Sequence, residues 1–244
     1  MNGNRTLLVW DLPTRLFHWL LAASVLGAFA IGLGVDDESR VFAVHMLLGA
    51  VAAFMVLLRV VWGLFGSRYA RFGSFAFGPS AVLGYFRGLF TRSDARWIGH
   101  NPGSSLAIFA MIVLTLGVAL TGALMGTAGE VFEEVHEILA YSLIGVAVGH
   151  VAGVALHTLR HRENLTGSMV HGLKVGDPKQ GIRSAHPGVA LVFLGLTTAW
   201  AVALTRGYDP TTGSVRLPLV GTTLTLGEGA EGERGQDGEE GDDD

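Results

Sequence analysis

The sequence predicts an all-α integral membrane protein, built as a four-helix transmembrane bundle with a fifth transmembrane helix. Half of its 244 residues are hydrophobic, only 16% are charged, and the mean hydropathy is +0.44. An ordinary soluble domain carries about 25% charged residues. Five apolar stretches explain the difference, and each approaches the roughly 20 residues with which a helix crosses a bilayer: residues 16–34, 41–65, 104–126, 135–157 and 188–205. Barrel strands are about half as long, so these stretches indicate helices.

Basic residues are concentrated in two of the four connections between these stretches. The second connection contains Arg68, Arg71, Arg87, Arg92 and Arg96, and the fourth contains Arg160, Arg162, Lys174, Lys179 and Arg183. The other two connections are acidic, with Asp36, Asp37, Glu38, Glu130, Glu133 and Glu134 against Arg40. Because basic loops remain in the cytoplasm, we expect a cytoplasmic N-terminus and an extracytoplasmic C-terminus.

Four histidines lie within the first, second and fourth apolar stretches: His18, His45, His136 and His150. Placing an imidazole in hydrocarbon without a polar partner costs free energy. A metal ion held between two helices is one partner that its ring nitrogen can bind. In the predicted orientation His45 and His136 share the outer side, and His18 lies on the inner side. His150 is about 21 Å along the helix from His136 and about 40° around its axis. One helix can therefore present a ligand to each of two stacked centres, which is typical of a haem-carrying membrane cytochrome. With no cysteine in the chain, haem would be held by axial ligands and packing alone.

Several motifs between residues 9 and 172 carry a family resemblance. They are Val9-Trp10-Asp11-Leu12-Pro13-Thr14-Arg15 running into Phe17-His18-Trp19, His45 with Gly49, Gly99-His100-Asn101-Pro102, and His136 and His150 followed by Arg162-Glu163-Asn164-Leu165. The chain resembles the bacterial di-haem cytochrome b family, the cytochrome b-561 class that includes membrane subunits of nickel-iron hydrogenases and formate dehydrogenases. The resemblance implies a protein of the bacterial inner membrane.

The same resemblance implies the cofactors and their ligands. Residues 1–172 would form a four-helix core with two non-covalent b haems, the inner one between His18 and His150 and the outer one between His45 and His136. Residues 173–206, a cytoplasmic linker and the fifth helix, and residues 207–244, an extracytoplasmic segment, would lie outside this core. His157 is a rival inner ligand, seven residues beyond His150 on nearly the same face, and depth along the helix slightly favours it. The resemblance favours His150.

Further residues have a cofactor interpretation and a simpler alternative. Arg15, Arg40 and Arg59 stand near the expected haem propionates, although Arg59 could instead extend to the membrane interface. Gly49 and Gly149, the latter in a series with Gly145 and Gly153, would let a haem ring approach, or would permit close helix packing. His100 would line a quinone site, contact a propionate or serve as an interfacial cap.

An iron with two imidazole ligands has no open position, so its natural chemistry is one-electron transfer. We expect electrons to pass between the quinone pool and a redox partner protein, such as a cytochrome c or a dehydrogenase or hydrogenase subunit. One alternative is a self-contained oxidoreductase that reduces quinone with superoxide or another small reductant, although the acidic outer loops disfavour a superoxide funnel. A second alternative is a histidine-dependent proton or metal transporter. No basic and aromatic surface indicates nucleic-acid binding.

Three segments outside the apolar stretches have their own predictions. Residues 80–90 alternate apolar and polar residues, which suggests a short helix on the membrane surface, or else a plain loop. Residues 209–226 suggest a short hairpin. Residues 227–244 hold nine acids and one arginine, which predicts a disordered tail. This tail would be a solvated terminus or would attract a basic redox partner.

Overall fold

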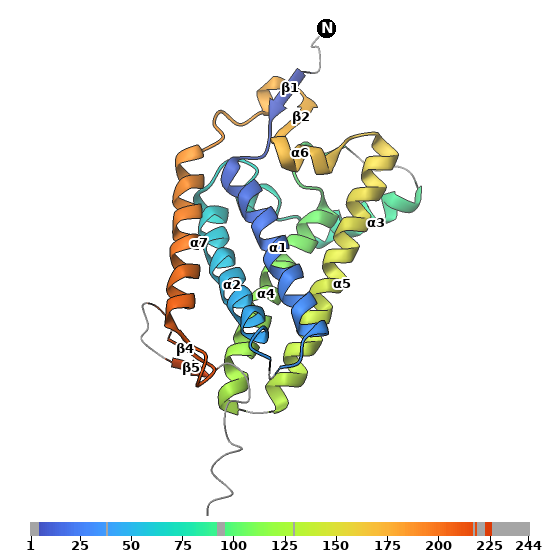
Figure 1. Cartoon of the computed structure of the whole chain (residues 1–244). Coiled ribbons are helices and arrows are strands. Elements are labelled where there is room, and N and C mark those ends of the chain that lie inside the picture. The colour runs from blue at the N-terminus through green and yellow to red at the C-terminus, as the bar shows by residue number, and fades with distance from the viewer. Residues whose placement is uncertain are drawn as a thin grey trace, which may run out of the picture.

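Five long helices form the body of the protein in the computed structural model, which describes residues 5–37, 39–91, 96–128, 130–216, 218 and 223–225. They are α1 (Leu12–Gly34), α2 (Phe42–Phe65), α4 (Pro102–Ala128), α5 (Glu130–His161) and α7 (Pro187–Gly207) (Figure 1). Each is long and apolar enough to cross a membrane. The predicted fold class, a helical membrane bundle with a fifth span, is confirmed.

The first four long helices form two hairpins. Helix α1 packs along α2, and α4 packs along α5, while α2 also contacts α4 and thereby joins the hairpins. Helix α7 lies against α1 and α2. There, Trp200 stacks on Phe54 with ring centres 4.8 Å apart and donates its indole N–H to Ala50 O at 3.3 Å. The fifth helix is thus attached to the side of the four-helix body.

Helix α1 begins at a buried carboxylate. Asp11 is its N-cap and accepts a hydrogen bond from Thr14 N at 2.8 Å. Its other oxygen accepts from Trp62 Nε1 at 3.1 Å and from the hydroxyl of Ser67. An N-cap side chain satisfies a backbone N–H that the first helical turn leaves unpaired. The start of α1 is therefore fixed to the end of α2.

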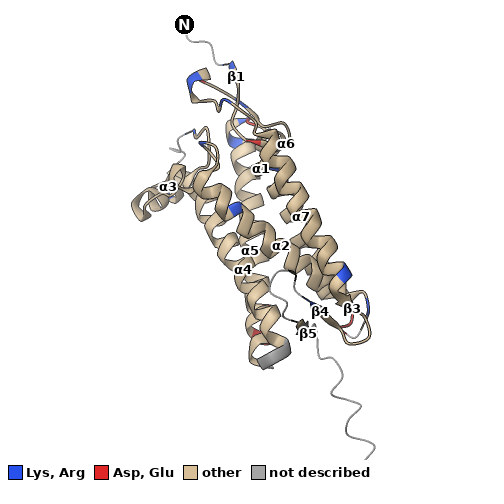
Figure 2. Ribbon diagram, turned by 90° about the vertical axis from the view of Figure 1, so that its left-hand side faces the viewer, with Lys and Arg blue, Asp and Glu red and all other residues tan. Residues whose placement is uncertain are grey.

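A small cap covers one end of the bundle. Strand β1 (Arg5–Leu8) pairs antiparallel with β2 (Leu173–Gly176), from Arg5 opposite Gly176 to Leu8 opposite Leu173. The short helices η1 (Phe72–Ser74), α6 (Leu165–His171) and η2 (Pro178–Gln180) lie in the connections at this end. A small apolar core forms under the strands, with Tyr69, Ile98 and Met169 packed on Leu7, Val9 and Trp10. Most of the Lys and Arg side chains gather here (Figure 2), so we call this the basic end.

Two segments outside the long helices form regular structure where the sequence suggested it. Residues 80–90 belong to helix α3 (Pro79–Thr91), which runs sideways from the bundle at the basic end. At the other end, which we call the opposite end, β3 (Tyr208–Asp209), β4 (Ser214–Arg216) and β5 (Thr223–Thr225) form a small antiparallel sheet. The acidic tail expected at residues 227–244 lies outside the described residues.

Candidate functional site

His45 and His136 meet near the opposite end of the bundle. His45 lies in the first turn of α2 and His136 in the second turn of α5, and their ring centres are 6.1 Å apart with 61° between the planes. A metal ion lies about 2 Å from an imidazole nitrogen, so two imidazoles on opposite sides of one ion have ring centres about 6 Å apart. The separation of this histidine pair therefore fits a shared metal ion, including the iron of a haem.

The protein also fixes the protonation pattern of both rings. His45 Nδ1 donates a hydrogen bond to Ala28 O at 2.7 Å, and His136 Nδ1 donates to Val118 O at 2.9 Å. The hydroxyl of Thr121 lies 3.2 Å from the same His136 nitrogen. Because a carbonyl oxygen can only accept, the proton is on Nδ1 and the lone pair is on Nε2. Such an outer hydrogen bond is the usual orienting contact of a metal-bound histidine.

A mostly apolar pocket, partly open to the outside, adjoins the two rings. Both histidines line it, together with mostly small side chains that include Ser24, Ala28, Gly49, Ala52, Ala119 and Ala140. Cofactor pockets are typically apolar, with a few polar groups that fix orientation. This lining suits a large apolar ring held by two imidazoles.

The glycines that the sequence singled out face open space. A Cβ atom built on Gly49, Gly145, Gly149 or Gly153 meets no atom within 4 Å, as far as the described residues show. Gly49 lines the pocket, and Gly149 directly precedes His150 on α5. These positions are therefore not close helix contacts in this structure, which favours the cofactor interpretation of Gly49 and Gly149.

A second group of histidines lies nearer the basic end. His18 on α1 and His150 on α5 are close enough for a charge on one to act on the other. His100, just before α4, interacts electrostatically with both, and its ring centre lies 4.7 Å from that of Trp10 and 4.5 Å from that of Phe75. Burial, as the largest cause, and charges on Arg59, His150, Lys174 and His18 together lower the pKa of His100 to about 3. His100 is therefore neutral near pH 7.

Two nitrogen atoms in this second group are unpaired. Within the described part of the chain, His18 Nδ1 and His100 Nε2 are buried without a hydrogen-bond partner. Unpaired buried polar atoms are rare in folded proteins and point to a bound group or water. The sequence prediction paired His18 with His150, and in the structure a charge on either of them acts on His100.

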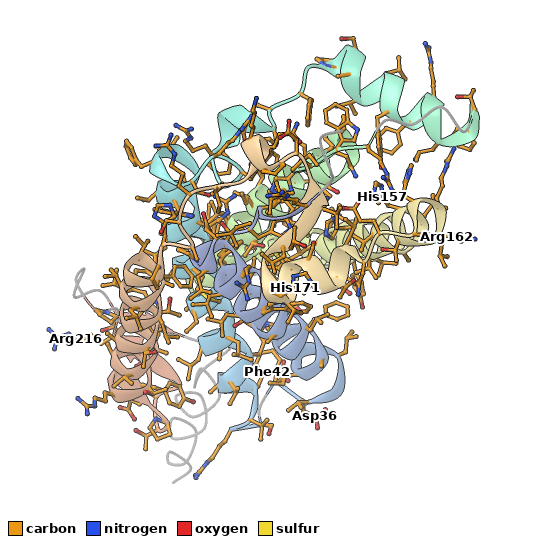
Figure 3. The ribbon with its side chains drawn as sticks, turned by 90° about the horizontal axis from the view of Figure 1, so that it is seen from above. Asp36, Phe42, His157, Arg162, His171 and Arg216 are labelled. Atoms are coloured by element: carbon orange, nitrogen blue, oxygen red, sulfur yellow. The ribbon has the colours of Figure 1, made fainter. Side chains whose placement is uncertain are left out.

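His157 has a different environment. It is buried, and its Nε2 lies 3.5 Å from Glu163 Oε2, while Glu163 Oε1 lies 2.9 Å from Lys174 Nζ. Lys174 also donates to Trp97 O at 3.1 Å. The His157 hydrogen bond and the Lys174 ammonium lower the pKa of Glu163 to about 2. Figure 3, which looks down on the bundle from above, labels His157 on α5 and Arg162, which directly follows that helix. The imidazole thus belongs to a polar cluster that joins α5 to β2.

The three candidate arginines occupy different environments. Arg59 is only 3% exposed, donates from Nη2 to Ala70 O at 2.9 Å, and lies over the Phe72 ring at 5.1 Å. Arg15 donates to Val170 O and so joins α1 to α6. Arg40 is exposed at the opposite end. Arg59 therefore ends at a loop carbonyl inside the fold.

The sequence interpretation missed the residues that hold the paired rings. A Cβ built on Gly32 would lie 3.1 Å from His45 Cε1 and Nδ1, and one on Gly122 would lie 3.2 Å from His136 Cε1. The carbonyls of Ala28 and Val118 lie one turn earlier on the same helices. A repeated pattern, Leu-Gly-x-x-x-x-Gly at residues 26–32 and 116–122, was the available signal.

A helical membrane bundle with an inward-facing histidine pair of this spacing has the architecture of a membrane cytochrome b. The family comparison agrees with that class. The chain belongs to the prokaryotic cytochrome b561 family, whose model matches residues 9–172. Membership in this family implies haem b.

The chain is also similar to several curated proteins. It is 24% identical over 208 aligned positions to a probable Ni/Fe-hydrogenase B-type cytochrome subunit of Rhizobium leguminosarum bv. viciae, covering 67% of this chain and 87% of that protein. It is 21% identical over 215 positions to a protein of the same name from Bradyrhizobium diazoefficiens, covering 70% and 86%. The corresponding protein of Escherichia coli K12, named hydrogenase 1 B-type cytochrome subunit, is 24% identical over 139 positions, covering 47% and 57%. No solved structure matches the chain.

Proposed function

We propose that this protein is an electron-transfer cytochrome that holds two b haems across the membrane, one between His45 and His136 and one between His18 and His150. The observation that carries the proposal is the 6.1 Å ring separation of His45 and His136, with both Nδ1 protons committed to carbonyls. Haem bound by two imidazoles supplies one-electron redox chemistry and leaves no position for oxygen.

The environment of His157 supports His150 as the partner of His18. His157 Nε2 faces a carboxylate that is itself paired with Lys174. If His157 bound the iron through Nε2, its contact with Glu163 would be lost. Glu163 and Lys174 would then have to adopt a new arrangement. His150 directly follows Gly149, which faces open space, so a flat ring can approach α5 at this level.

The remaining candidate residues would serve the haem periphery. Gly49 and Gly149 would let the rings approach α2 and α5. Arg15, Arg40 and Arg59 are the cations available to propionates, and Arg59 Nη1 is buried without a partner among the described residues. His100, neutral and beside His18 and His150, would border a quinone.

The partners follow from the relatives and the charge distribution. Three similar proteins carry the name of a Ni/Fe-hydrogenase cytochrome subunit. We therefore propose that this protein exchanges electrons with a hydrogenase on one side and with the quinone pool on the other. A cytochrome c or a dehydrogenase subunit is the alternative partner. The basic end would face the cytoplasm, with residues 1–172 as the haem core, residues 173–206 as linker and fifth helix, and residues 207–244 outside the membrane.

Counting haem in ligand variants tests this proposal. A pyridine haemochrome assay of the purified protein should give about two b haems per chain. His45→Ala and His136→Ala should each remove the same haem, whereas His18→Ala and His150→Ala should each remove the other. His157→Gln is the matched control and should retain both. A wild-type protein without haem refutes the proposal, and loss of haem in His157→Gln with retention in His150→Ala would reassign the ligand.

A further inference from the structure

The two helical hairpins hold His45 and His136 by the same arrangement. In the first hairpin, α1 supplies the Ala28 carbonyl and, one turn later, Gly32, and α2 supplies His45. In the second, α4 supplies the Val118 carbonyl and, one turn later, Gly122, and α5 supplies His136. We call each carbonyl and glycine pair a histidine socket.

The resemblance of the two hairpins extends beyond the sockets. Gly27 and Gly117 each lie five residues before the socket glycine. A Cβ on Gly27 would lie 3.2 Å from a methyl group of Leu48, three residues after His45, and one on Gly117 would lie 3.2 Å from a methyl group of Leu139, three residues after His136. The hairpins therefore match in sequence and in contact geometry, as two copies of one structural unit.

The contact distances explain why the socket residue is glycine. Residues four apart lie on one face of a helix, so the carbonyl and the glycine form a groove one turn long, and the imidazole edge lies in it. A methyl group on Gly32 or Gly122 would stand 3.1–3.2 Å from the ring. An imidazole is rigid and tied by its Nδ1 bond, so the whole ring would have to move by a few tenths of an ångström.

We propose that Gly32 and Gly122 are positioning residues that set the orientation and the Nδ1 hydrogen bond of the two axial ligands at the opposite end, and thereby the reduction potential of that haem. The inference rests on the proposed haem ligation by His45 and His136. A hydrogen bond to the far ring nitrogen makes a histidine ligand more basic, which favours ferric iron. Shifting the ring weakens this bond and raises the reduction potential.

No socket of this kind is found at the second centre among the described residues. His18 Nδ1 is buried without a hydrogen-bond partner there, and no described glycine has His18 or His150 among the nearest atoms to a built Cβ. The effect of a socket substitution is therefore expected at one haem and not at the other.

The test compares Gly32→Ala and Gly122→Ala with Gly27→Ala and Gly117→Ala in the haem-loaded full-length protein. The control substitutions lie on the same helices and meet the neighbouring helix at 3.2 Å, but there they press on a flexible leucine methyl. The readouts are the electron paramagnetic resonance signals of the ferric haems and a potentiometric titration of both haems. The larger variants Gly32→Val and Gly122→Val are assayed for haem content.

Both socket alanine variants should change the resonance signal and raise the potential of the haem that His45→Ala removes, and leave the other haem unchanged. The valine variants should lower the haem content from about two per chain to about one. The control variants should match wild type in both readouts. Unchanged signals in the socket alanine variants, equal shifts at both haems, or the same shifts in the controls would overturn the inference alone. Absence of haem from wild type would overturn the proposed function with it.

Discussion

The two histidine centres differ, at the level of single residues, in whether the imidazole Nδ1 atoms have hydrogen-bond partners. At the opposite end both rings are held by backbone carbonyls. Near the basic end, His18 Nδ1 has no such contact among the described residues. Holding a group in its bound geometry reduces the ordering cost of binding, by about 0.5–1.5 kcal/mol for each immobilised side chain. The pair His45 and His136 is therefore the better preorganised site.

This difference predicts an order of haem affinity. The His18→Ala variant keeps the preorganised site of His45 and His136, and the His45→Ala variant keeps only the second site. In titrations of the haem-free proteins, His18→Ala should bind haem about tenfold more tightly than His45→Ala. Absorbance at the haem band measures both dissociation constants under the same detergent conditions. Equal affinities, or tighter binding by His45→Ala, would contradict the role assigned to the carbonyls.

The cluster of Glu163, His157 and Lys174 predicts a pH-dependent contribution to stability. The pKa of Glu163 falls to about 2 from an ordinary 4.5 because His157 and Lys174 favour its charged form. A lowered carboxyl pKa stabilises the fold fully above about pH 4.5, and this contribution is lost as the pH falls toward 2. Glu163→Gln should therefore cost about 1–3 kcal/mol at pH 7, and much less near pH 3.

Thermal unfolding in detergent at the two pH values measures this effect. Glu133→Gln, at an exposed position on α5, is the control and should unfold like wild type at both pH values. A Glu163→Gln deficit of the same size at pH 3 as at pH 7 would show that packing, not charge, gives Glu163 its role.

At the scale of elements, helix α3 presents an apolar stripe that the described fold does not cover. Leu83, Phe86 and Phe90 share one face of the helix and are 51%, 41% and 90% exposed. Gly88 faces inward and is buried, and Arg160 of α5 donates to the Leu89 carbonyl at 2.9 Å. A helix with one apolar face beside a transmembrane bundle lies in the membrane interface with that face toward the acyl chains.

Labelling at single cysteines tests the placement of α3, since the native chain contains none. Spin labels at Leu83→Cys, Phe86→Cys and Phe90→Cys should be accessible to oxygen dissolved in lipid and protected from a water-soluble relaxation agent. Labels at Ala81→Cys and Gly84→Cys, two exposed positions on the other side of the same helix, are the controls and should show the reverse. Equal exposure of both faces to the aqueous agent would place α3 in solution.

The sequence predicted those elements whose signal is local. Apolar length defined the five spans, and histidine spacing with alternating topology brought His45 near His136. The β1–β2 ribbon was missed because its two short strands are separated by almost the whole haem core. The sockets were missed because a glycine shows its contact only when the opposing helix is placed. His100 joined the second centre for the same reason, through a loop whose path the sequence does not encode locally.

At the scale of the whole molecule, charge divides the bundle into two ends. Lys and Arg residues gather at the end with β1, α6 and α3 (Figure 2), while Asp36, which follows α1, and Glu133, in the first turn of α5, belong to the other end. With basic loops inside, Asp36→Cys should react with an impermeant maleimide added to intact spheroplasts. Ser74→Cys should react only after the membrane is permeabilised. The reverse pattern would invert the orientation and move the His45 and His136 centre to the cytoplasmic side.

The β1–β2 ribbon has a consequence for biosynthesis. Residues 5–8 leave the ribosome first, yet their pairing partner, residues 173–176, emerges only after α5 has been translated. The first four spans are therefore synthesised before the ribbon at the basic end can form. A chain that stops before residue 173 lacks the second strand, so this end of the bundle stays uncovered by the ribbon until residues 173–176 are made.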